Sequence, residues 1–487
     1  MWGCEISNLL TKSKYMIGLY CPKHFWMIYN DPGKIPEHSK DTLHKFDQGN
    51  IVGEMAKKLF PDGVDIPTED FMGNIRSTQT AIKHSQTLFE GGIMVGNLFS
   101  RADILKPVKD EWDIIEVKSS TKVKEENIFD VAFQKHCLIE SGLKIRKCFL
   151  MHINNQYVRE GDLDPKELFT KTDITEQVDE VLSEVPKNIG KLLNILTGKC
   201  PEEKKGFCCD GPYPCPVSEF HKLLPEHHIF QLIRGGKKIK ELFESGVVAF
   251  DDIPKDYELK EKHKIQVECA KTGKPHIDKE GIKKFMDKLK NPLSYLDFET
   301  FRTAIPPYDG TKPYQQIPFQ YSMHIDKEHK EFLADGSKDP REEFLVSLKK
   351  DLGDKGSIVA YNKSFEIRIL KETVKGFPEY NEWVKKVIDR FVDLYDVFRE
   401  FHYYSPLQKG STSIKYVLPA LTGKSYDDLE IGGGDDASLA YLDIMTGKLN
   451  KDEVDKIRMN LKKYCELDTE GMVLVMGELN KLNLING

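Results

Sequence analysis

Residues 294–301 read Ser-Tyr-Leu-Asp-Phe-Glu-Thr-Phe, an apolar stretch interrupted by two acids. The pattern predicts a β-strand, and side chains i and i+2 of a strand share one face, about 6.6 Å apart along the chain. Asp297 and Glu299 would therefore lie side by side. Burying two neighbouring carboxylates is costly unless a cation lies between them. The stretch thus predicts a buried strand whose acidic face holds a metal ion.

Two later stretches carry further candidates. Residues 358–370, IVAYNKSFEIRIL, are typical of a strand that runs into a helix, with Asn362 and Glu366 near the junction. Residues 464–473, YCELDTEGMV, place Tyr464 and Asp468 four residues apart, on one face of a helix. Each acid by itself also fits a solvated position, and Tyr464 by itself fits a core position. The three motifs together favour a metal site.

The motifs Asp-x-Glu, Asn-x-x-Phe-Glu and Tyr-x-x-x-Asp, in this order, resemble the DnaQ-type exonucleases of the ribonuclease-H-like fold. The resemblance implies two divalent ions, Mg²⁺ or Mn²⁺, which neutralise the charge that develops on a phosphodiester. The implied ligands are Asp297, Glu299, Glu366 and Asp468, and Tyr464 is implied to orient the water. The second motif of those exonucleases normally ends in Asp. The longer Glu366 either displaces an ion or reaches it through a water.

The N-terminal part of the chain carries a second polar set. Asp103 lies in SRADI at 100–104, and Glu116 and Lys118 alternate along IIEVK at 114–118. Asp103 and Glu116 together can bind a metal ion, while Lys118 can hold the attacking water or stabilise the charged phosphorane. The alternative for Glu116 and Lys118 is a surface ion pair, worth about 0–1 kcal/mol.

This set resembles the PD-(D/E)xK nuclease core, in its RecB-like branch. The resemblance implies that Gln134, on the following helix, completes the site. RecB-like sites often have a histidine earlier in the chain, but residues 49–60 contain none. Glu90 is our main candidate for the outermost ligand, and Glu54 is a weaker one.

Cysteines stand at both ends of this region, in CPKHF at 21–25 and CCDGPYPCPVSEFH at 208–221. Ten cysteines in 487 residues are too few for a disulfide scaffold. Four of them lie close together at 200–215, and this crowding predicts metal ligation. The bracketing resembles iron–sulfur RecB-like nucleases of the CRISPR-associated and AddB type, which implies a [4Fe–4S] cluster. The candidate ligands are Cys21, Cys209 and Cys215, with His221, Cys208 or Cys200 as the fourth. A histidine ligand also fits Zn²⁺, and free loop thiols are the remaining alternative.

The length of 487 residues predicts two or three domains, at roughly 100–200 residues each. We expect three regions: an α/β domain at 1–228, a lysine-rich helical connector at 229–291 and a second α/β domain at 292–487. In the first, the pattern predicts helices at 53–60 and 129–141 and strands at 92–99, 114–118 and 148–153. In the last, it predicts strands at 294–298, 319–325 and 357–361 and a helix at 451–482.

The net charge and the hydropathy of the sequence limit the kinds of partner that we expect. The net charge of −7 provides no global attraction for nucleic acid. The lysine groups at 234–240, 255–264 and 283–290 are either local phosphate contacts or solvated helix faces. The sequence contains no bilayer-spanning apolar run and no secretory segment at its start, so we expect a cytoplasmic protein without a membrane partner.

End to end, the chain resembles a bacterial family of unassigned function that fuses a RecB-like nuclease to a DnaQ-like domain. The resemblance implies a metal-dependent deoxyribonuclease, a phosphodiesterase, with a C-terminal 3′–5′ exonuclease site and a second, N-terminal nuclease site. Repair or defence against foreign DNA would suit such an enzyme. One alternative is a single-site exonuclease whose N-terminal domain binds nucleic acid without cutting it. Another is a ribonuclease, because two-metal chemistry does not require a particular sugar.

Overall fold

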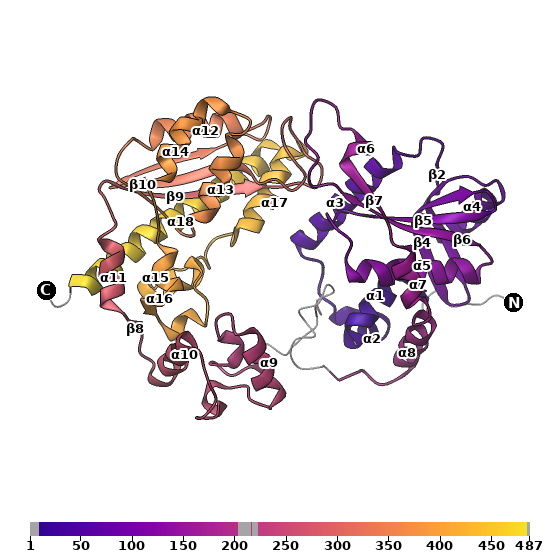
Figure 1. Ribbon diagram of the computed structural model, residues 1–487, viewed down its shortest axis with the longest axis horizontal. Coiled ribbons are helices and arrows are strands. Elements are labelled where there is room, and N and C mark those ends of the chain that lie inside the picture. The colour runs from indigo at the N-terminus through magenta and orange to yellow at the C-terminus, as the bar shows by residue number, and fades with distance from the viewer. Residues whose placement is uncertain (1–8, 203–215, 217–222, 485–487) are drawn as a thin grey trace. The chain divides into compact units, whose positions relative to one another are not determined.

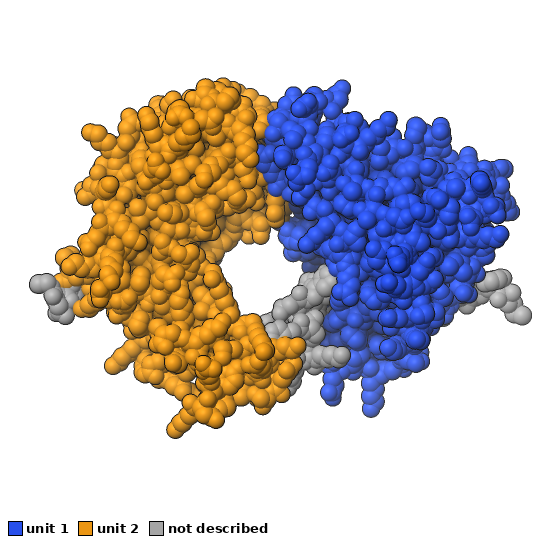
Figure 2. Space-filling view, in the orientation of Figure 1, with its two compact units in different colours: residues 1–223, 303–315 blue, residues 224–302, 316–487 orange. Residues whose placement is uncertain are grey.

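The computed structural model describes residues 9–202, 216 and 223–484, and the chain forms two compact mixed α/β units (Figures 1 and 2). Unit 1 comprises residues 1–223 and 303–315, and unit 2 comprises residues 224–302 and 316–487. The region 229–291, which we expected to be a separate connector, is counted in unit 2. In the part of the chain that the structure describes, no helix is long and apolar enough to span a bilayer.

Unit 1 is built on one sheet. Within the described residues it has seven strands in the order β2-β3-β4-β5-β6-β7, with β1 paired to β4. β3 (Leu88–Val95), β4 (Leu98–Val108) and β5 (Glu111–Lys118) form an antiparallel meander. β6 (Ile145–Ile153) then pairs with β5 in parallel. A parallel pair needs a crossover connection, which α5 (Glu125–Glu140) supplies. The shorter strands are β1 (Leu10–Thr11), β2 (Val64–Asp65) and β7 (Phe169–Asp173).

Helix α5 is buried along most of its length and is central to the core of unit 1. Phe133 of α5 stacks on Tyr15, with ring centroids 4.6 Å apart. Tyr15 belongs to α1 (Lys12–Tyr20), so this packing fixes the N-terminal helix against α5. The other helices of unit 1 are α2 (Pro22–Asn30), α3 (Lys40–Lys57), α4 (Phe71–Lys83), α6 (Pro165–Leu168), α7 (Thr175–Leu182) and α8 (Val185–Thr197).

Two of our boundaries in unit 1 were wrong. The stretch 92–99, predicted as one strand, is a hairpin in which β3 ends at Val95 and β4 begins at Leu98. Gly96, with φ +55°, forms the turn between them in the left-handed region that glycine adopts at little cost. Apolar residues lie on both sides of this turn, so the pattern did not separate the strands. The helix predicted at 53–60 overlaps the end of α3, which begins at Lys40 and ends at Lys57.

The main sheet of unit 2 has β9 (Leu293–Phe301) at its centre. Among the described residues it has five strands in the order β11-β10-β9-β12-β13. β10 (Ile317–Ile325) and β11 (Glu328–Leu333) form an antiparallel hairpin on one side of β9. β12 (Ser357–Ala360) and β13 (Phe391–Asp393) run parallel to β9 on the other side. A small second sheet pairs β8 (His276–Ile277) with β14 (Tyr403–Tyr404).

Alternate residues of β9 face two different environments, because side chains along a strand alternate between faces. Leu296 and Phe298 join a buried apolar cluster with Phe344 of α12 (Arg341–Asp351). The opposite face packs against α18 (Lys451–Leu484), where Gln320 of β10 donates a 3.0 Å hydrogen bond to the carbonyl of Leu461. Asp297 and Glu299 lie on this second face of β9.

The remaining helices of unit 2 are α9 (Gly236–Glu244), α10 (Glu261–Thr272), α11 (Lys279–Met286), α13 (Ser364–Thr373), α14 (Asn381–Ile388), α15 (Tyr395–Arg399), α16 (Ile414–Thr422) and α17 (Gly434–Met445). Helix α13 follows β12 after a short turn formed by residues 361–363.

Candidate functional site

A pocket of about 680 Å³ in unit 2 is lined by every residue that the three C-terminal motifs predicted to act together. These residues are Asp297 and Glu299 from β9, Glu366 from α13, and Tyr464 and Asp468 from α18. Glu299, Glu366 and Asp468 are each less than 10% exposed. Segments far apart in the sequence thus bring four carboxyl groups to one pocket.

The turn between β12 and α13 determines where Glu366 points. Asn362 adopts φ +74° there, in the left-handed region, and its N–H donates a 2.8 Å hydrogen bond to Oδ1 of Asp393 at the end of β13. Asp393 also accepts a hydrogen bond from the N–H of Tyr395. Helix α13 therefore starts at a fixed angle to the sheet, with Glu366 buried in its first turn.

The four carboxyl groups lack enough positive charge around them. Burial, together with repulsion from Asp468, raises the pKa of Asp297 well above its ordinary value. Burial and the neighbouring Asp297 raise the pKa of Glu299 and of Glu366 in the same way. Burial raises the pKa of Asp468 to about 6. Such shifts indicate that ionisation of these carboxyl groups is disfavoured in the metal-free site and would be favoured by a nearby cation.

The donor atoms fit a hard divalent cation. Oε2 of Glu366 is buried and has no hydrogen-bond partner among the described residues, so a lone pair remains for a ligand. Asp297, Glu299 and Cys465 each place one potential ligand atom within 4.8 Å of the other two. Carboxylate oxygens are the ligands that Mg²⁺ and Mn²⁺ prefer. Because burial raises the pKa of the Cys465 thiol, its sulfur stays protonated and is the least suitable of the three.

Sequence reasoning missed two polar neighbours of the pocket. The hydroxyl of Tyr426 donates a 2.6 Å hydrogen bond to Oδ1 of Asp468. Nζ of Lys415 lies 5.5 Å from the ring centroid of Tyr464 and donates a hydrogen bond to the carbonyl of Gly432. Lys415 lies in the stretch GSTSIKYVLPAL at 410–421, outside the three motifs. Tyr426 stands far from the three motifs in sequence, and no local pattern marks it.

A second pocket, of about 610 Å³, shares Asn362 with the first. Five of its lining residues are cationic: Lys363, Arg368, Lys371, Lys375 and Arg399. Three are acidic: Glu372, Asp393 and Asp396. The lining of this second pocket therefore carries more positive than negative side chains.

In unit 1, the predicted residues Glu116, Lys118 and Gln134 are in direct contact. Nε2 of Gln134 donates a 2.7 Å hydrogen bond to Oε2 of Glu116, and Nζ of Lys118 lies 2.5 Å from Oε1 of the same carboxylate. Asp103 accepts a 2.8 Å hydrogen bond from the N–H of Val117, the residue between Glu116 and Lys118. The structure thus brings these four predicted residues together.

Two further residues belong to this cluster, and sequence reasoning missed both. Lys12 of α1 places Nζ 2.8 Å from Oε1 of Glu116, and Asp130 of α5 accepts a 2.8 Å hydrogen bond from Lys118. Burial opposes ionisation of Glu116, but Lys118 and Lys12 outweigh it and hold the pKa of Glu116 below its ordinary value. Burial and the charge of Glu116 raise the pKa of Asp103 to about 7. The N-terminal cluster therefore contains lysine counter-charges that compensate much of its acidity.

Glu90 and Glu54, the two candidates for the outermost metal ligand of unit 1, have different surroundings. Glu90 pairs with Arg101 at 3.1 Å, and its charge makes a smaller contribution to the raised pKa of Asp103 than burial or Glu116 does. Glu54 is an exposed residue of α3 that pairs with Lys57 at 2.6 Å. Among the described residues, no hydrogen bond or ion pair joins Glu54 to Asp103 or Glu116.

Of the cysteines predicted to bind a metal, only Cys21 and Cys200 lie among the described residues. Cys21 is buried at the start of α2, where its sulfur accepts a hydrogen bond from the N–H of His24 at 3.4 Å. Cys200 is exposed. Cys208, Cys209, Cys215 and His221 lie outside the described residues.

Several lysines of the groups at 234–240, 255–264 and 283–290 form ion pairs with acids on the same helices, whereas Lys262 pairs with Glu400 after α15. Lys237 pairs with Glu241, and Lys284 pairs with Glu280. Such exposed pairs are typical of solvated helix faces. Arg234, at the start of the first group, instead lines the carboxylate pocket.

Comparison with known proteins gives two findings. Residues 294–413 match the model of a family described as a domain of unknown function, DUF2779, and this range includes Asp297, Glu299 and Glu366. The chain is also 30% identical over 222 residues to the uncharacterized protein MG366 of Mycoplasma genitalium, and 31% identical over 232 residues to its uncharacterized homologue in Mycoplasma pneumoniae. These matches cover 40% and 41% of this chain and 33% and 34% of the relatives. The chain thus spans about a third of the length of the curated relatives it matches.

Proposed function

We propose that the chain is a metal-dependent nuclease in which unit 2 is a DnaQ-like 3′–5′ exonuclease. The observation that carries this proposal is the convergence of Asp297, Glu299, Glu366 and Asp468 on one pocket. Their raised pKa values indicate that the charge of these groups is not balanced by the protein itself. Phosphodiester hydrolysis is the reaction that uses such a set, because the substrate is already anionic.

The four acids of the pocket, two of its other residues and the neighbouring Tyr426 then have roles in the proposed enzyme. The four carboxylates would hold Mg²⁺ or Mn²⁺, which would supply Lewis-acid stabilisation of the phosphate and acidify the attacking water. The side chain of Tyr464 is buried next to Asp468 and would orient that water through its hydroxyl. Lys415 lines the same pocket and would contact a phosphate oxygen. Tyr426 would hold Asp468 in its ionised form through the hydrogen bond to Oδ1.

We propose the ribonuclease-H-like fold for unit 2. The order β11-β10-β9-β12-β13 supports it, because the first strand of the sheet is central and bears the first acidic motif. The second motif then follows a strand that is parallel to β9, and the third comes from a helix packed on the acidic face of β9. This arrangement lets three sequence motifs meet at one place.

We propose a nucleic-acid strand, with DNA preferred to RNA, as the substrate. The cationic side chains around the second pocket support a polyanion, and Asn362 connects this pocket to the carboxylates. Arg234, which lines the first pocket, would add another charge for the phosphate backbone. The preference for DNA rests on the resemblance to DnaQ-type and RecB-like enzymes.

For unit 1 we propose a RecB-like PD-(D/E)xK nuclease domain, supported by α4, the meander β3–β4–β5, and the α5 crossover to β6. Asp103 and Glu116 would hold a divalent ion, Lys118 would contact the water or the phosphate, and Gln134 would orient Glu116. Cys21 would be one ligand of an iron–sulfur cluster or of Zn²⁺, with the others in the region 200–221.

A second candidate function is a single-site exonuclease whose unit 1 binds nucleic acid without cutting it. Its support is the charge compensation of Glu116, which accepts contacts from Lys12, Lys118 and Gln134 at 2.8, 2.5 and 2.7 Å. A carboxylate surrounded in this way has less need of a metal ion than the acids of unit 2.

The experiment that tests the proposal uses the full chain, purified without oxygen, and single- and double-stranded DNA and RNA labelled at either end. Cleavage is followed with Mg²⁺ or Mn²⁺ for the wild type, Asp297→Asn and Lys118→Ala, with the exposed Asp354→Asn as the matched control. We expect 3′-end trimming by the wild type and by Asp354→Asn, and its loss in Asp297→Asn. Trimming that survives in Asp297→Asn would contradict the proposal, and faster degradation of RNA would favour the ribonuclease.

A further inference from the structure

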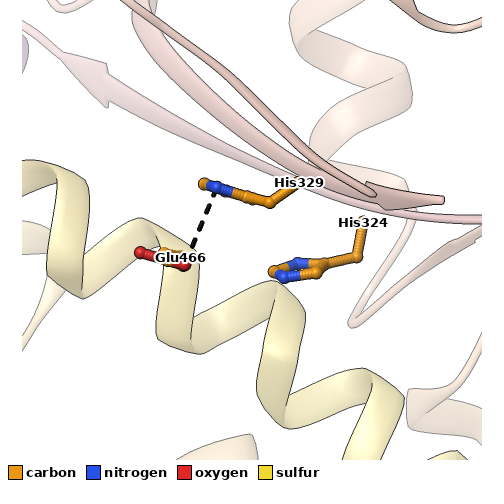
Figure 3. Close-up of side chains that lie close together, drawn as sticks. All are labelled: His324, His329 and Glu466. Carbon is orange, nitrogen blue, oxygen red and sulfur yellow. Dashed lines mark ion pairs between the residues drawn. The ribbon is translucent and has the colours of Figure 1, made fainter. Parts of the chain in front are cut away.

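Two histidines and a glutamate form a cluster that the proposed nuclease chemistry does not use. His324 of β10 and His329 of β11 stand directly opposite each other across the antiparallel hairpin, and Glu466 belongs to α18. Each residue offers one metal-ligating atom within 4.8 Å of the other two. Figure 3 shows both imidazoles extending from the hairpin toward the helix that carries Glu466.

We propose that His324, His329 and Glu466 bind one zinc-type transition-metal ion. Two imidazoles and one carboxylate are a ligand set that suits Zn²⁺ and related ions rather than Mg²⁺. All three side chains are partly exposed, so an ion has access to the cluster and water can supply the remaining ligand.

The separation of the ligand atoms supports this assignment. Nδ1 of His329 and Oε1 of Glu466 lie 3.7 Å apart, longer than a normal hydrogen bond. Two ligands bound at about 2.0–2.1 Å around a tetrahedral ion stand roughly 3.3–3.5 Å from each other. A small rotation of the more exposed Glu466 side chain would therefore complete the site.

Hydrogen bonds already fix the orientation of both rings. Nδ1 of His324 lies 2.8 Å from Oγ1 of Thr469, and Nε2 of His329 lies 2.9 Å from Oγ of Ser322. The two hydroxyl oxygens are themselves 2.7 Å apart. When a histidine donates one ring N–H to such a partner, its other nitrogen keeps a lone pair for a metal ion. The hydroxyl pair thus leaves Nε2 of His324 and Nδ1 of His329 available together.

Binding of an ion here would tie α18 to the β10–β11 hairpin. Glu466 lies on α18 between Tyr464 and Asp468, and Ser322 stands opposite Asp297 in the register of β9 and β10. The zinc-type ion would therefore have a structural role, holding the helix that carries part of the carboxylate pocket. Zinc binding at the cluster is independent of whether the chain cleaves nucleic acid.

The test is a titration of the metal-free full chain with Zn²⁺ at neutral pH in excess Mg²⁺, with bound zinc and Tm measured. We expect the wild type and the exposed control His84→Ala to bind one zinc ion more than His329→Ala. Binding of this ion should raise the Tm of the wild type and of His84→Ala, and His329→Ala should not show this increase. Equal zinc content in the wild type and His329→Ala would overturn the proposal, and so would displacement of the ion by Mg²⁺.

Two further measurements locate the ion. Asp297→Asn should keep it, whereas its loss there would assign it to the carboxylate pocket and overturn the proposal. When Co²⁺ replaces Zn²⁺, thiolate charge-transfer absorption reports whether cysteines bind the ion. This absorption should be the same in the wild type and in His329→Ala. A difference in that absorption would assign the lost ion to the cysteines. If His329→Ala does not fold, Glu466→Gln should weaken zinc binding about tenfold or more, and unchanged affinity would contradict the site.

Discussion

The hydroxyl of Tyr426 lies 2.6 Å from Oδ1 of Asp468 and donates a hydrogen bond to it. Asp468 is buried beside other acids, and burial raises its pKa to about 6. The hydrogen bond acts in the opposite direction, because it stabilises the ionised carboxylate. Tyr426 therefore holds one member of the acidic cluster closer to the form that binds a cation.

Replacing Tyr426 by phenylalanine should make Asp468 harder to ionise. A hydrogen bond to a charged group contributes about 1.5–3 kcal/mol, so we expect Mn²⁺ affinity to fall about tenfold or more. The acidic limb of the pH–rate profile should move to higher pH, because the pKa of Asp468 rises further. Calorimetric titration with Mn²⁺ and the pH dependence of cleavage measure these effects. An unchanged acidic limb would mean that Asp468 does not limit activity in that range.

Asp297→Asn should remove 3′-end trimming and also make the metal-free protein more stable. Burial and the charge of Asp468 raise the pKa of Asp297, so the ionised group is unfavourable when no cation is bound. Removing it should raise the free energy of unfolding by on the order of 1–2 kcal/mol at pH 8. Denaturation in the presence of a chelator measures this change, with Asp354→Asn as the control. Loss of stability in Asp297→Asn would show that its carboxylate is compensated.

The stability of the metal-free chain should fall as pH rises from about 4 to 6. In the folded protein the pKa of Asp468 is about 6, above the ordinary value near 4, so the folded state binds more protons than the unfolded state in this window. The loss of folding stability caused by ionising Asp468 is absent below the pKa of this group in the unfolded state. It reaches roughly 3 kcal/mol above the pKa of the group in the folded state. Denaturation of the wild type and Asp468→Asn across this pH range should show a steeper fall for the wild type. Added Mn²⁺ should stabilise the wild type more at pH 8 than at pH 5.

Lys118→Ala should destabilise the chain while leaving 3′-end trimming intact. Lys118 contacts both Glu116 and Asp130, at 2.5 and 2.8 Å, and its removal leaves two buried carboxylates with Lys12 as their remaining close cation among the described residues. We expect a loss of about 3 kcal/mol, because breaking one side of a buried charge pair is strongly destabilising. Denaturation and end-labelled DNA assays measure the two effects. Any cleavage that disappears in Lys118→Ala but persists in Asp297→Asn belongs to unit 1.

The sequence predicted the local placement of the unit 2 motif residues on a strand and a helix, but it missed a turn in unit 1. The pattern of SYLDFETF placed Asp297 and Glu299 on one face of a strand, and β9 has that geometry because alternation along a strand is local. The spacing of Tyr464 and Asp468 likewise placed them on one face of α18. The hairpin at Gly96 escaped prediction because its turn interrupts the apolar pattern only briefly.

The sequence by itself therefore determined which residues lie on one face of a strand or helix, because that depends on spacing along the chain. Only the tertiary structure decided which faces meet. It placed Lys12 against Glu116, Tyr426 against Asp468, and His324 and His329 near Glu466. Packing of helices α1 and α18 against their sheets creates these contacts, and no local spacing encodes a contact between residues so far apart in the chain.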